Sequence, residues 1–318
     1  MNKERLHMGR KINYSLTELV REKKPLIHCI TNYVTAQDVA NIILACGGSP
    51  IMADHPEETA EVSALCSGLL LNTGTLKESS MDAMIGAGRE ANRLNHPIIL
   101  DPVGCGASRQ RIQTILAVIK EIRLTVIRGN VSEIKYLLNA LVAKRNNAKH
   151  PTCLQFPASE VKGPANTMRG VDADFFDDIT ENSLISLIEN AKALSAMTGA
   201  VVVMTGSTDI VSTWKETWLI RNGCPEMSRI TGSGCMLDGI IAAYVAAVSD
   251  SSGSITSQEL IVEAVALATA AAGVCGERAE EKTKKNQAGC GTFRCYFMDE
   301  VSLLDEVVLK GGAKVEIW

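Results

Sequence analysis

Residues Pro97–Gly104 read PIILDPVG, so a short apolar run ends in a carboxylate and a rigid turn that contains glycine. A helical pattern begins after Ser108, a typical N-cap residue. Its apolar positions share one helix face at Ile112, Ile115, Leu116 and Ile119. The stretch therefore predicts a buried strand, a polar turn at its carboxyl end, and a helix that crosses back over a sheet.

The same alternation of apolar runs and helical segments recurs along the chain. Further strand-like runs are Pro25–Ile30, Leu69–Leu71, Leu124–Ile127 and Ala200–Met204. After the first of them, one helix face is predicted from Ala36, Val39, Ala40, Ile43 and Leu44. Strands that are apolar throughout need helices on both faces of their sheet, so we expect a three-layer α/β/α fold with a mostly parallel central sheet. Ligands of such folds bind at the carboxyl ends of the strands.

Two segments depart from this alternation. Asp209–Ile220 alternates imperfectly between apolar and polar residues and predicts a hairpin beside the main sheet. Val142–Asn166 contains three prolines and few large apolar residues, so it predicts an exposed insertion without catalytic residues. We interpret residues 1–318 as a single domain.

The composition limits the classes of partner. The chain has 318 residues and a net charge of −4, and its lysines and arginines are dispersed, so no nucleic-acid surface is predicted. The start of the chain lacks the apolar core of a secretory signal, and the apolar stretch Ala264–Gly276 is shorter than the roughly 20 residues that cross a membrane. Ten cysteines and five histidines lack the spacing of a zinc site and indicate reduced thiols. We expect a cytoplasmic protein without a membrane segment.

Residues Ile230–Gly239 read ITGSGCMLDG and place a glycine turn directly before Met236–Val248, which predicts an apolar helix. Gly232 and Gly234 permit backbone angles that are closed to larger residues. The amides that follow them would lie at the positive end of the helix dipole and point at an anion. We expect a phosphate site here, with an ordinary glycine turn as the alternative.

Polar side chains follow three of the apolar runs. Asp101 is a candidate magnesium ligand, directly or through water, because this cation prefers oxygen ligands, and a turn-forming aspartate is the alternative. Arg128 would neutralise polyphosphate, and Glu133 would help to hold magnesium if Asn130 begins a helix. The alternative is an Asn130–Glu133 capping pair with a solvated arginine. Thr205 would bind a nucleotide phosphate or only close a turn.

A further region combines hydrogen-bonding and apolar side chains. Residues His28–Thr35 read HCITNYVT and follow a strand, where they would bind a small polar or heteroaromatic molecule. Met52 adds an adaptable thioether. The structural alternatives are a gap-filling Met52 and a buried, hydrogen-bonded His28. The sequence thus predicts a pocket for an acceptor molecule near these segments.

Six motifs together carry a resemblance to a known family. They are Ile30–Thr35 (ITNYVT), Pro50–Ala53 (PIMA), Asn72–Leu76 (NTGTL), Asp101–Gly104 (DPVG), Arg128–Glu133 (RGNVSE) and Thr231–Cys235 (TGSGC). In this order the chain resembles the hydroxyethylthiazole kinase family over nearly its whole length. The resemblance implies a ribokinase-like fold and ATP-dependent phosphorylation of the primary alcohol of 4-methyl-5-(2-hydroxyethyl)thiazole, in thiamine salvage or biosynthesis, with Mg²⁺ accompanying ATP. It also implies a homotrimer with sites shared between subunits.

The resemblance also implies roles for single residues. Arg128 and Thr205 resemble nucleotide contacts, while the thiazole contacts would be Met52, Gly232, Asn32 and Val34. Cys235 stands where many ribokinase-like enzymes have an aspartate base, whereas the thiazole kinases resemble this chain in having a cysteine there. Our hypothesis is that Cys235 orients or helps to deprotonate the substrate hydroxyl, while the amides from Gly232 through Gly234 to Cys235 stabilise the transferring phosphate.

Two departures from the family pattern affect these expectations. Gln37 stands where the family is expected to have a shorter polar residue, which leaves the shape of the acceptor pocket open. The insertion at 142–166 is also longer than expected. Two other functions stay open: a related kinase for another small alcohol such as a hydroxymethylpyrimidine, and a catalytically silent protein that binds a nucleotide or a thiazole.

Overall fold

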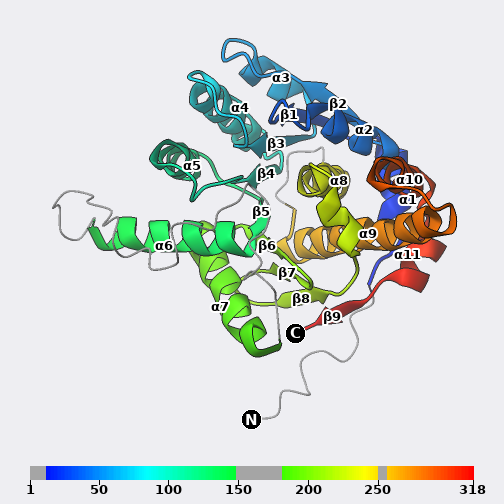
Figure 1. The fold of residues 1–318 in the computed structure, drawn as a ribbon. Coiled ribbons are helices and arrows are strands. Elements are labelled where there is room, and N and C mark those ends of the chain that lie inside the picture. The colour runs from blue at the N-terminus through cyan, green and yellow to red at the C-terminus, as the bar shows by residue number, and fades with distance from the viewer. Residues whose placement is uncertain (1–11, 148–180, 250–255) are drawn as a thin grey trace.

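The computed structural model describes residues 12–147, 181–249 and 256–318, and these contain one nine-stranded sheet (Figure 1). The strands are β1 (Leu26–Ile30), β2 (Ser49–Met52), β3 (Gly68–Asn72), β4 (Ile98–Asp101), β5 (Val126–Asn130), β6 (Val201–Thr205), β7 (Asp209–Ser212), β8 (Thr217–Ile220) and β9 (Val315–Ile317). Their order across the sheet is β2-β1-β3-β4-β5-β6-β7-β8-β9. Neighbours are parallel from β2 to β6 and antiparallel from β6 to β9. The expected mostly parallel sheet is confirmed.

Helices cover both faces of this sheet. They are α1 (Leu16–Lys23), α2 (Ala36–Cys46), α3 (Thr59–Leu65), α4 (Ser80–Arg93), α5 (Arg109–Glu121), α6 (Val131–Asn147), α7 (Glu181–Thr198), α8 (Ser233–Val248), α9 (Gln258–Lys285), α10 (Cys290–Leu303) and α11 (Glu306–Gly312), with a short 3₁₀ helix at Pro225–Arg229. Figure 1 shows α4 to α7 on one side of the sheet and α1, α2, α8, α9 and α10 on the other. The three-layer α/β/α architecture is confirmed.

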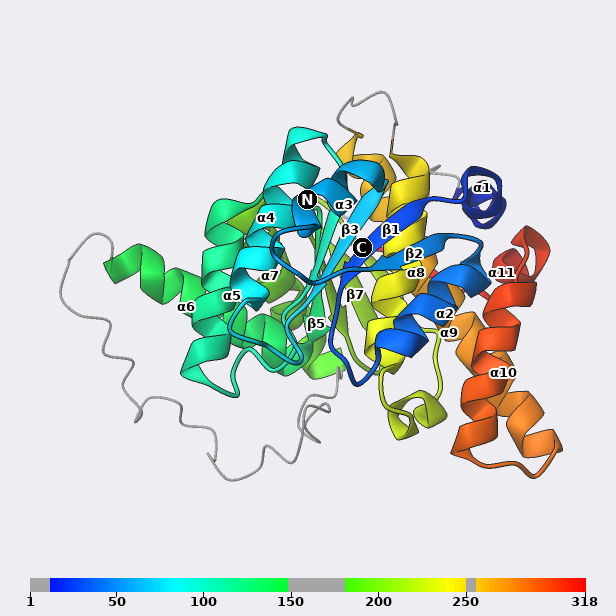
Figure 2. The ribbon, with the colours of Figure 1, turned by 90° about the horizontal axis from the view of Figure 1, so that it is seen from above.

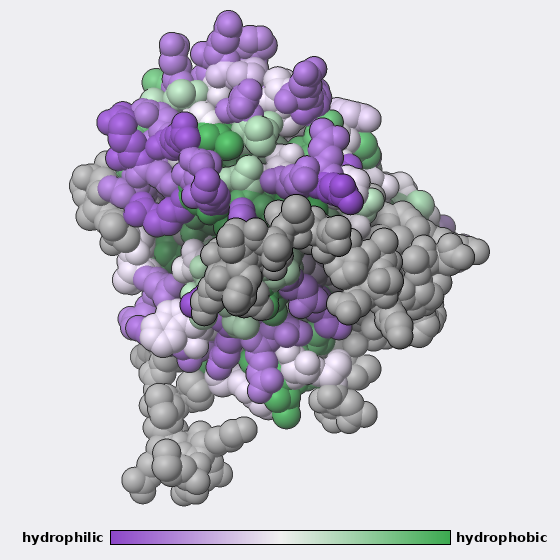
Figure 3. All heavy atoms as spheres, turned by 90° about the vertical axis from the view of Figure 1, so that its left-hand side faces the viewer, coloured by the Kyte–Doolittle hydropathy of each residue, from purple (hydrophilic) through white to green (hydrophobic). Residues whose placement is uncertain are grey.

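Each face of the sheet has its own core because side chains alternate along a strand. In β4, Ile99 packs in one core, while Ile98 and Leu100 pack in the other. Figure 3 views the molecule from the side of α5 and α6, and hydrophilic side chains make up most of the coloured surface there. The outer helices are therefore amphipathic, as the period of their apolar residues predicts.

The predicted strands are all present, and the hairpin predicted at Asp209–Ile220 is the pair β7 and β8. Ser108 caps α5 as expected, since its hydroxyl accepts a hydrogen bond from the amide of Arg111 at 3.2 Å. Strands β2 and β9 were not predicted, because each is short and lies at an edge of the sheet. Edge strands are only partly buried and so lack a continuous apolar run.

The prediction of which residues form the buried face of α2 is partly wrong. Val39 and Ile43 are buried as expected, but Leu44 is 55% exposed, and Ile42 is buried instead. Because α2 packs against α8 and α10, its buried face is rotated toward these helices. Figure 2 shows α10 alongside α2.

Two other expectations concern the predicted insertion and the apolar stretch Ala264–Gly276. Residues 142–147 of the predicted insertion form the end of α6, and residues 148–166 lie outside the described residues. The apolar stretch Ala264–Gly276 lies in α9, the one described helix that is long and apolar enough to cross a membrane. Most of α9 is buried inside the protein, which is typical of a core helix.

Candidate active site

Polar residues meet at the carboxyl ends of the central strands. The sheet register pairs Asn72 at the end of β3 with Asp101 at the end of β4, and Asn130 at the end of β5 with Thr205 at the end of β6. The amide nitrogen Nδ2 of Asn72 donates to Oδ2 of Asp101 at 2.7 Å. Cys235, in the first turn of α8, has its Sγ 4.0 Å from the same oxygen. The predicted strand-end residues and the glycine turn therefore lie in one place.

Arg128 links these groups electrostatically. Its side chain is only 12% exposed, and Nη1 lies 3.6 Å from Oδ2 of Asp101. Nη2 donates to Oγ1 of Thr205 at 3.1 Å, and Nε lies 3.9 Å from Oδ1 of Asp238. The alternative of a solvated arginine is therefore wrong, and the two predicted nucleotide contacts, Arg128 and Thr205, are in direct contact.

Gly232 and Gly234 are each needed in the turn, for different structural reasons. Gly232 has a φ of 86° and precedes the first residue of α8, so it uses the backbone freedom expected of it. Gly234 is not among the residues with positive φ, so that expectation is wrong for it. Its hydrogen side chain is needed for space, because a Cβ there would lie 2.5 Å from Nη1 of Arg128. The guanidinium thus lies directly against the turn.

Cys235 lies between two side-chain amides and the carboxylate of Asp101. The Nδ2 atoms of Asn32 and Asn72 each lie 3.4 Å from its Sγ and can donate to it. Burial raises the pKa of the Cys235 thiol to about 12, and the negative charge of Asp101 adds to the shift. The thiol is therefore protonated at neutral pH, which favours orientation of a substrate hydroxyl over its deprotonation.

Glu133 takes part in the capping arrangement that the sequence left as an alternative. Its Oε2 accepts from the amide of Asn130 at 2.9 Å, and Oδ1 of Asn130 accepts from the amide of Glu133 at 2.8 Å. Its other oxygen accepts from the amide of Gly104 at 2.7 Å. Burial, followed by the charge of Asp101, raises the pKa of Glu133 to about 7. Both oxygens are already hydrogen-bonded, so this carboxylate fits a magnesium ion better through water than directly.

Asp101 fits an ion more directly. It is fully buried, and its Oδ1 has no hydrogen-bond partner within the described ranges. Burial is the main cause that raises the pKa of Asp101, and the neighbouring Asp238 adds to it. A buried carboxylate oxygen without a donor is an available ligand for a cation.

The predicted acceptor residues divide into two groups. Asn32 is buried and reaches Cys235, whereas Val34 and Met52 are 58% and 42% exposed at the surface of the single chain. Gln37 is also exposed. For His28 the structural alternative is right, because its ring nitrogens contact Oγ of Ser63 at 2.7 Å and the carbonyl of Ala53 at 2.8 Å.

Sequence reasoning missed three residues near this cluster. Asn72 follows an apolar run, so the strand-end rule that selected Asp101 could have selected it. Asp238 is a lone carboxylate within an otherwise apolar helix, and it is fully buried. Arg111 donates to the carbonyls of Thr73, Gly74 and Val103 at 2.5, 2.7 and 3.1 Å, and so ties together the loops after β3 and β4. Its role depends on tertiary contacts and left no local sequence signal.

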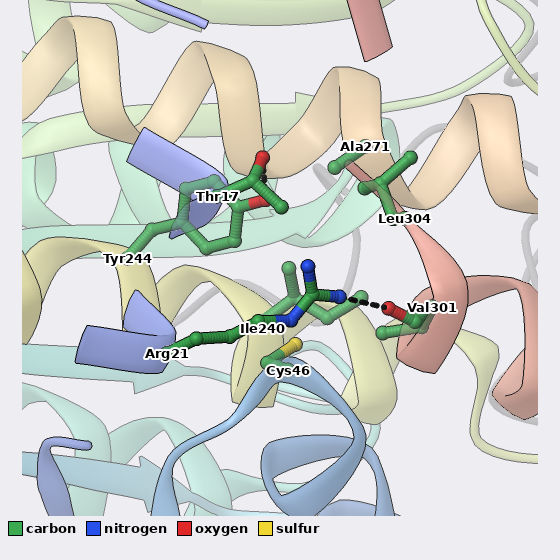
Figure 4. Close-up of a pocket in the computed structure, with 8 residues that line it drawn as sticks. All are labelled: Thr17, Arg21, Cys46, Ile240, Tyr244, Ala271, Val301 and Leu304. Carbon is green, nitrogen blue, oxygen red and sulfur yellow. Dashed lines mark hydrogen bonds between the residues drawn. The ribbon is translucent and has the colours of Figure 1, made fainter. Parts of the chain in front are cut away.

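A small cavity lies elsewhere, between α1, α8, α9 and α10 (Figure 4). Thr17 and Tyr244 share a hydrogen bond of 3.0 Å at its wall, and Arg21 donates to the carbonyl of Val301 at 3.5 Å. Its volume of about 10 Å³ suits a single water molecule. None of its lining residues belongs to the predicted site.

Comparison with known proteins identifies the family to which the chain belongs. A hydroxyethylthiazole kinase from Clostridium acetobutylicum is 44% identical over 95% of this chain and 98% of its own length. One from Alkaliphilus oremlandii is 38% identical over 95% of this chain and 96% of its own length. The solved structure of a hydroxyethylthiazole kinase protein from Pyrococcus horikoshii is 27% identical, covers 95% of this chain and 97% of that chain, and superimposes with a TM-score of 0.74. The model of the hydroxyethylthiazole kinase family matches residues 17–150 and 153–306, and the chain therefore belongs to this family.

Proposed function

We propose that this protein transfers the γ-phosphoryl group of ATP to the hydroxyl of 4-methyl-5-(2-hydroxyethyl)thiazole, in thiamine salvage or biosynthesis. The observation that carries the proposal is the meeting of Asp101, Arg128, Thr205 and Cys235 at the amino end of α8. An arginine, a buried carboxylate and a helix amino end are the groups that phosphoryl transfer requires. The acceptor alcohol is assigned from the family to which the chain belongs.

On the nucleotide side, Arg128 and Thr205 contact the phosphates, and the amides between Gly232 and Cys235 stabilise the transferring group. The helix amino end favours negative charge, and the guanidinium lies against it. Asp101 would hold Mg²⁺, with Glu133 acting through water, and the ion would neutralise charge on the phosphates. The side chains of Asp101 and Glu133 are held in place by Asn72 and by the amide of Gly104.

On the acceptor side, Asn32, Val34, Met52 and Gly232 contact the thiazole. Cys235 orients the hydroxyl as a protonated thiol, because its pKa is raised to about 12. The transition state of phosphoryl transfer is loose, so the position of the hydroxyl matters more than the strength of a base. This favours orientation over the proton-accepting role of Cys235.

We also propose that the protein is a cytoplasmic homotrimer whose sites are shared between subunits. Tyr33, Val34 and Met52 are exposed apolar side chains at the edge-strand side of the sheet. A neighbouring subunit placed there would enclose the acceptor, since these side chains are open to solvent in the single chain. Sedimentation analysis of the wild-type protein and a Val34→Asp variant tests the assembly, and a monomeric wild-type protein would contradict it.

A panel of alcohols tests the acceptor assignment. The purified protein is supplied with ATP, Mg²⁺ and either the thiazole alcohol or a hydroxymethylpyrimidine, and each phosphorylated product is measured. We expect the thiazole alcohol to give the higher kcat/KM. A preference for the pyrimidine would assign the chain to a related small-alcohol kinase, and tight binding without ADP formation would indicate a silent binding protein.

A further inference from the structure

Asp238 is a buried carboxylate that the proposed reaction does not use. It lies on α8, one turn after Cys235, and is fully buried. Neither of its oxygens accepts a hydrogen bond from the residues that the structure describes. Nε of Arg128 lies 3.9 Å from its Oδ1, beyond hydrogen-bond distance, and a buried carboxylate that accepts no hydrogen bond favours a further positive species nearby.

Two other groups face the same space. One ligand atom each from Asp101, Cys235 and Asp238 lies within 4.8 Å of the other two. Cys235 and Asp238 are three residues apart on one helix and so share a face, while Asp101 approaches from the end of β4. Oδ1 of Asp101 also lacks a hydrogen-bond partner among the described residues. Three buried carboxylate oxygens are thus available beside one sulfur.

The cluster contains three acidic side chains and one basic side chain. Two carboxylates face one guanidinium, that of Arg128, whose Nη1 and Nε lie 3.6 and 3.9 Å from Asp101 and Asp238. With both carboxyls and the thiol deprotonated by metal binding, the four side chains together carry a charge of −2. A divalent cation would then make the group of four side chains neutral, and the ion pairs would offset the cost of burial.

We propose that Asp101, Cys235 and Asp238 form a binding site for a thiophilic divalent cation such as zinc, beside the magnesium position assigned to Asp101 and Glu133. Sulfur with two carboxylates is a ligand set that zinc accepts, whereas magnesium requires oxygen ligands and octahedral geometry. Zinc binds its ligand atoms at about 2.0–2.3 Å, and in a tetrahedral site these atoms are roughly 3.5 Å from one another. The ligand atoms of Asp101, Cys235 and Asp238 would therefore move about 1 Å closer together when zinc binds. A water molecule would complete the four ligands, and binding would release the thiol proton of Cys235 to solvent.

Zinc at this position would inhibit phosphoryl transfer. It would engage the carboxylate that holds magnesium and the thiol that orients the acceptor hydroxyl. Metal binding at this site is measured without ATP or alcohol, so it can succeed or fail independently of the proposed function.

Cobalt(II), which takes the place of zinc and reports sulfur ligation, tests the site. It is titrated into the nucleotide-free protein in a Cys290→Ser/Cys295→Ser background, which removes the two thiols that are exposed among the described residues. We expect a sulfur-to-cobalt charge-transfer band and the intense visible bands of four-coordinate cobalt. Cys235→Ser should abolish the charge-transfer band. Asp238→Asn should weaken cobalt binding by at least about tenfold, since even outer partners of a ligand contribute about 10–100-fold.

A matched variant separates the site from general effects on the fold. Glu263→Gln neutralises another buried carboxylate, which accepts a hydrogen bond from the amide of Asn13 at 2.8 Å, and it should leave cobalt affinity unchanged. Circular dichroism checks that each variant is folded, and Asp238→Ser replaces Asp238→Asn if the latter is not. A cobalt spectrum without charge transfer, or one that Cys235→Ser leaves unchanged, would overturn the proposal. Equal cobalt affinity in the wild-type protein and a folded Asp238 variant would remove Asp238 from the site.

Discussion

The guanidinium of Arg128 occupies the space in which a side chain at position 234 would lie. A Cβ on Gly234 would be 2.5 Å from Nη1 and 2.8 Å from Cζ of Arg128. These distances are too short for two non-bonded atoms, so glycine at position 234 and the position of Arg128 depend on each other. The glycine turn is therefore fitted to a charged side chain from a neighbouring strand.

Gly234→Ala should displace Arg128 without unfolding the protein, because the guanidinium is the far end of a flexible side chain. We expect the KM for ATP to rise about tenfold or more, which matches the loss of about 1.5–3 kcal/mol for a hydrogen bond to a charged group. Steady-state kinetics with ATP varied measures this change. Gly291→Ala is the matched control, since a Cβ there meets no atom within 4 Å. An unchanged KM for ATP in Gly234→Ala would show that Arg128 does not need its present position.

Asn72→Ala should lower kcat, because Asn72 holds both Asp101 and Cys235. Its Nδ2 lies 2.7 Å from Asp101 and 3.4 Å from Cys235, while its Oδ1 accepts from Asn32 at 3.0 Å. The substitution removes one hydrogen-bond partner from each of these buried groups, at a cost of about 1–3 kcal/mol in unfolding free energy. Kinetics and denaturant unfolding measure the two effects.

The control for this variant is Asn222→Ala. Asn222 is also buried, but it joins the carbonyl of Gly312 and the amide of Lys314. It should lose stability to a similar extent while kcat stays unchanged. A fall in kcat of the same size in both variants would mean that Asn72 acts only on stability.

The strand-end residues could be predicted from the sequence, and their contacts could not. Asp101 and Thr205 follow apolar runs, and parallel strands bring such residues to one edge of the sheet. The partners of Arg128 come from β4, β6 and α8, and no local pattern indicates contacts between segments so far apart. Leu44 is a second example of a placement that the sequence could not predict. The helical period predicts that α2 has an apolar face, but the packing of the neighbouring helices decides which residues of that face are buried.

Cys235→Asp should retain turnover if the residue at 235 orients the hydroxyl, because a carboxylate can also accept a hydrogen bond from it. The thiol has its pKa raised to about 12, mainly by burial, so the wild-type rate should show no ionisation of Cys235 between about pH 6 and 9. The pH dependence of kcat in both proteins measures this. Complete loss of turnover in a folded Cys235→Asp variant would argue against a replaceable role for the thiol.

Asp209→Asn should change how stability depends on pH. Burial raises the pKa of Asp209 from 3.8 to about 7, against the opposing effect of the hydrogen bond from Gly206. Between these values the folded state holds a proton that the unfolded state has released, so the free energy of unfolding should fall as pH rises from about 4 to 7. Urea unfolding at several pH values should show this slope in the wild-type protein and a flatter one in Asp209→Asn. If the unfolding free energy has the same slope against pH in the wild-type protein and in Asp209→Asn, the carboxyl of Asp209 is solvated and its pKa is not raised.

The central claim is tested most directly by following ADP and thiazole phosphate in one reaction of the purified protein with ATP, Mg²⁺ and the thiazole alcohol. We predict equal amounts of both products at every time point, and the loss of both in a folded Arg128→Ala variant. ADP that accumulates without thiazole phosphate, or full product formation by the Arg128→Ala variant, would contradict the account.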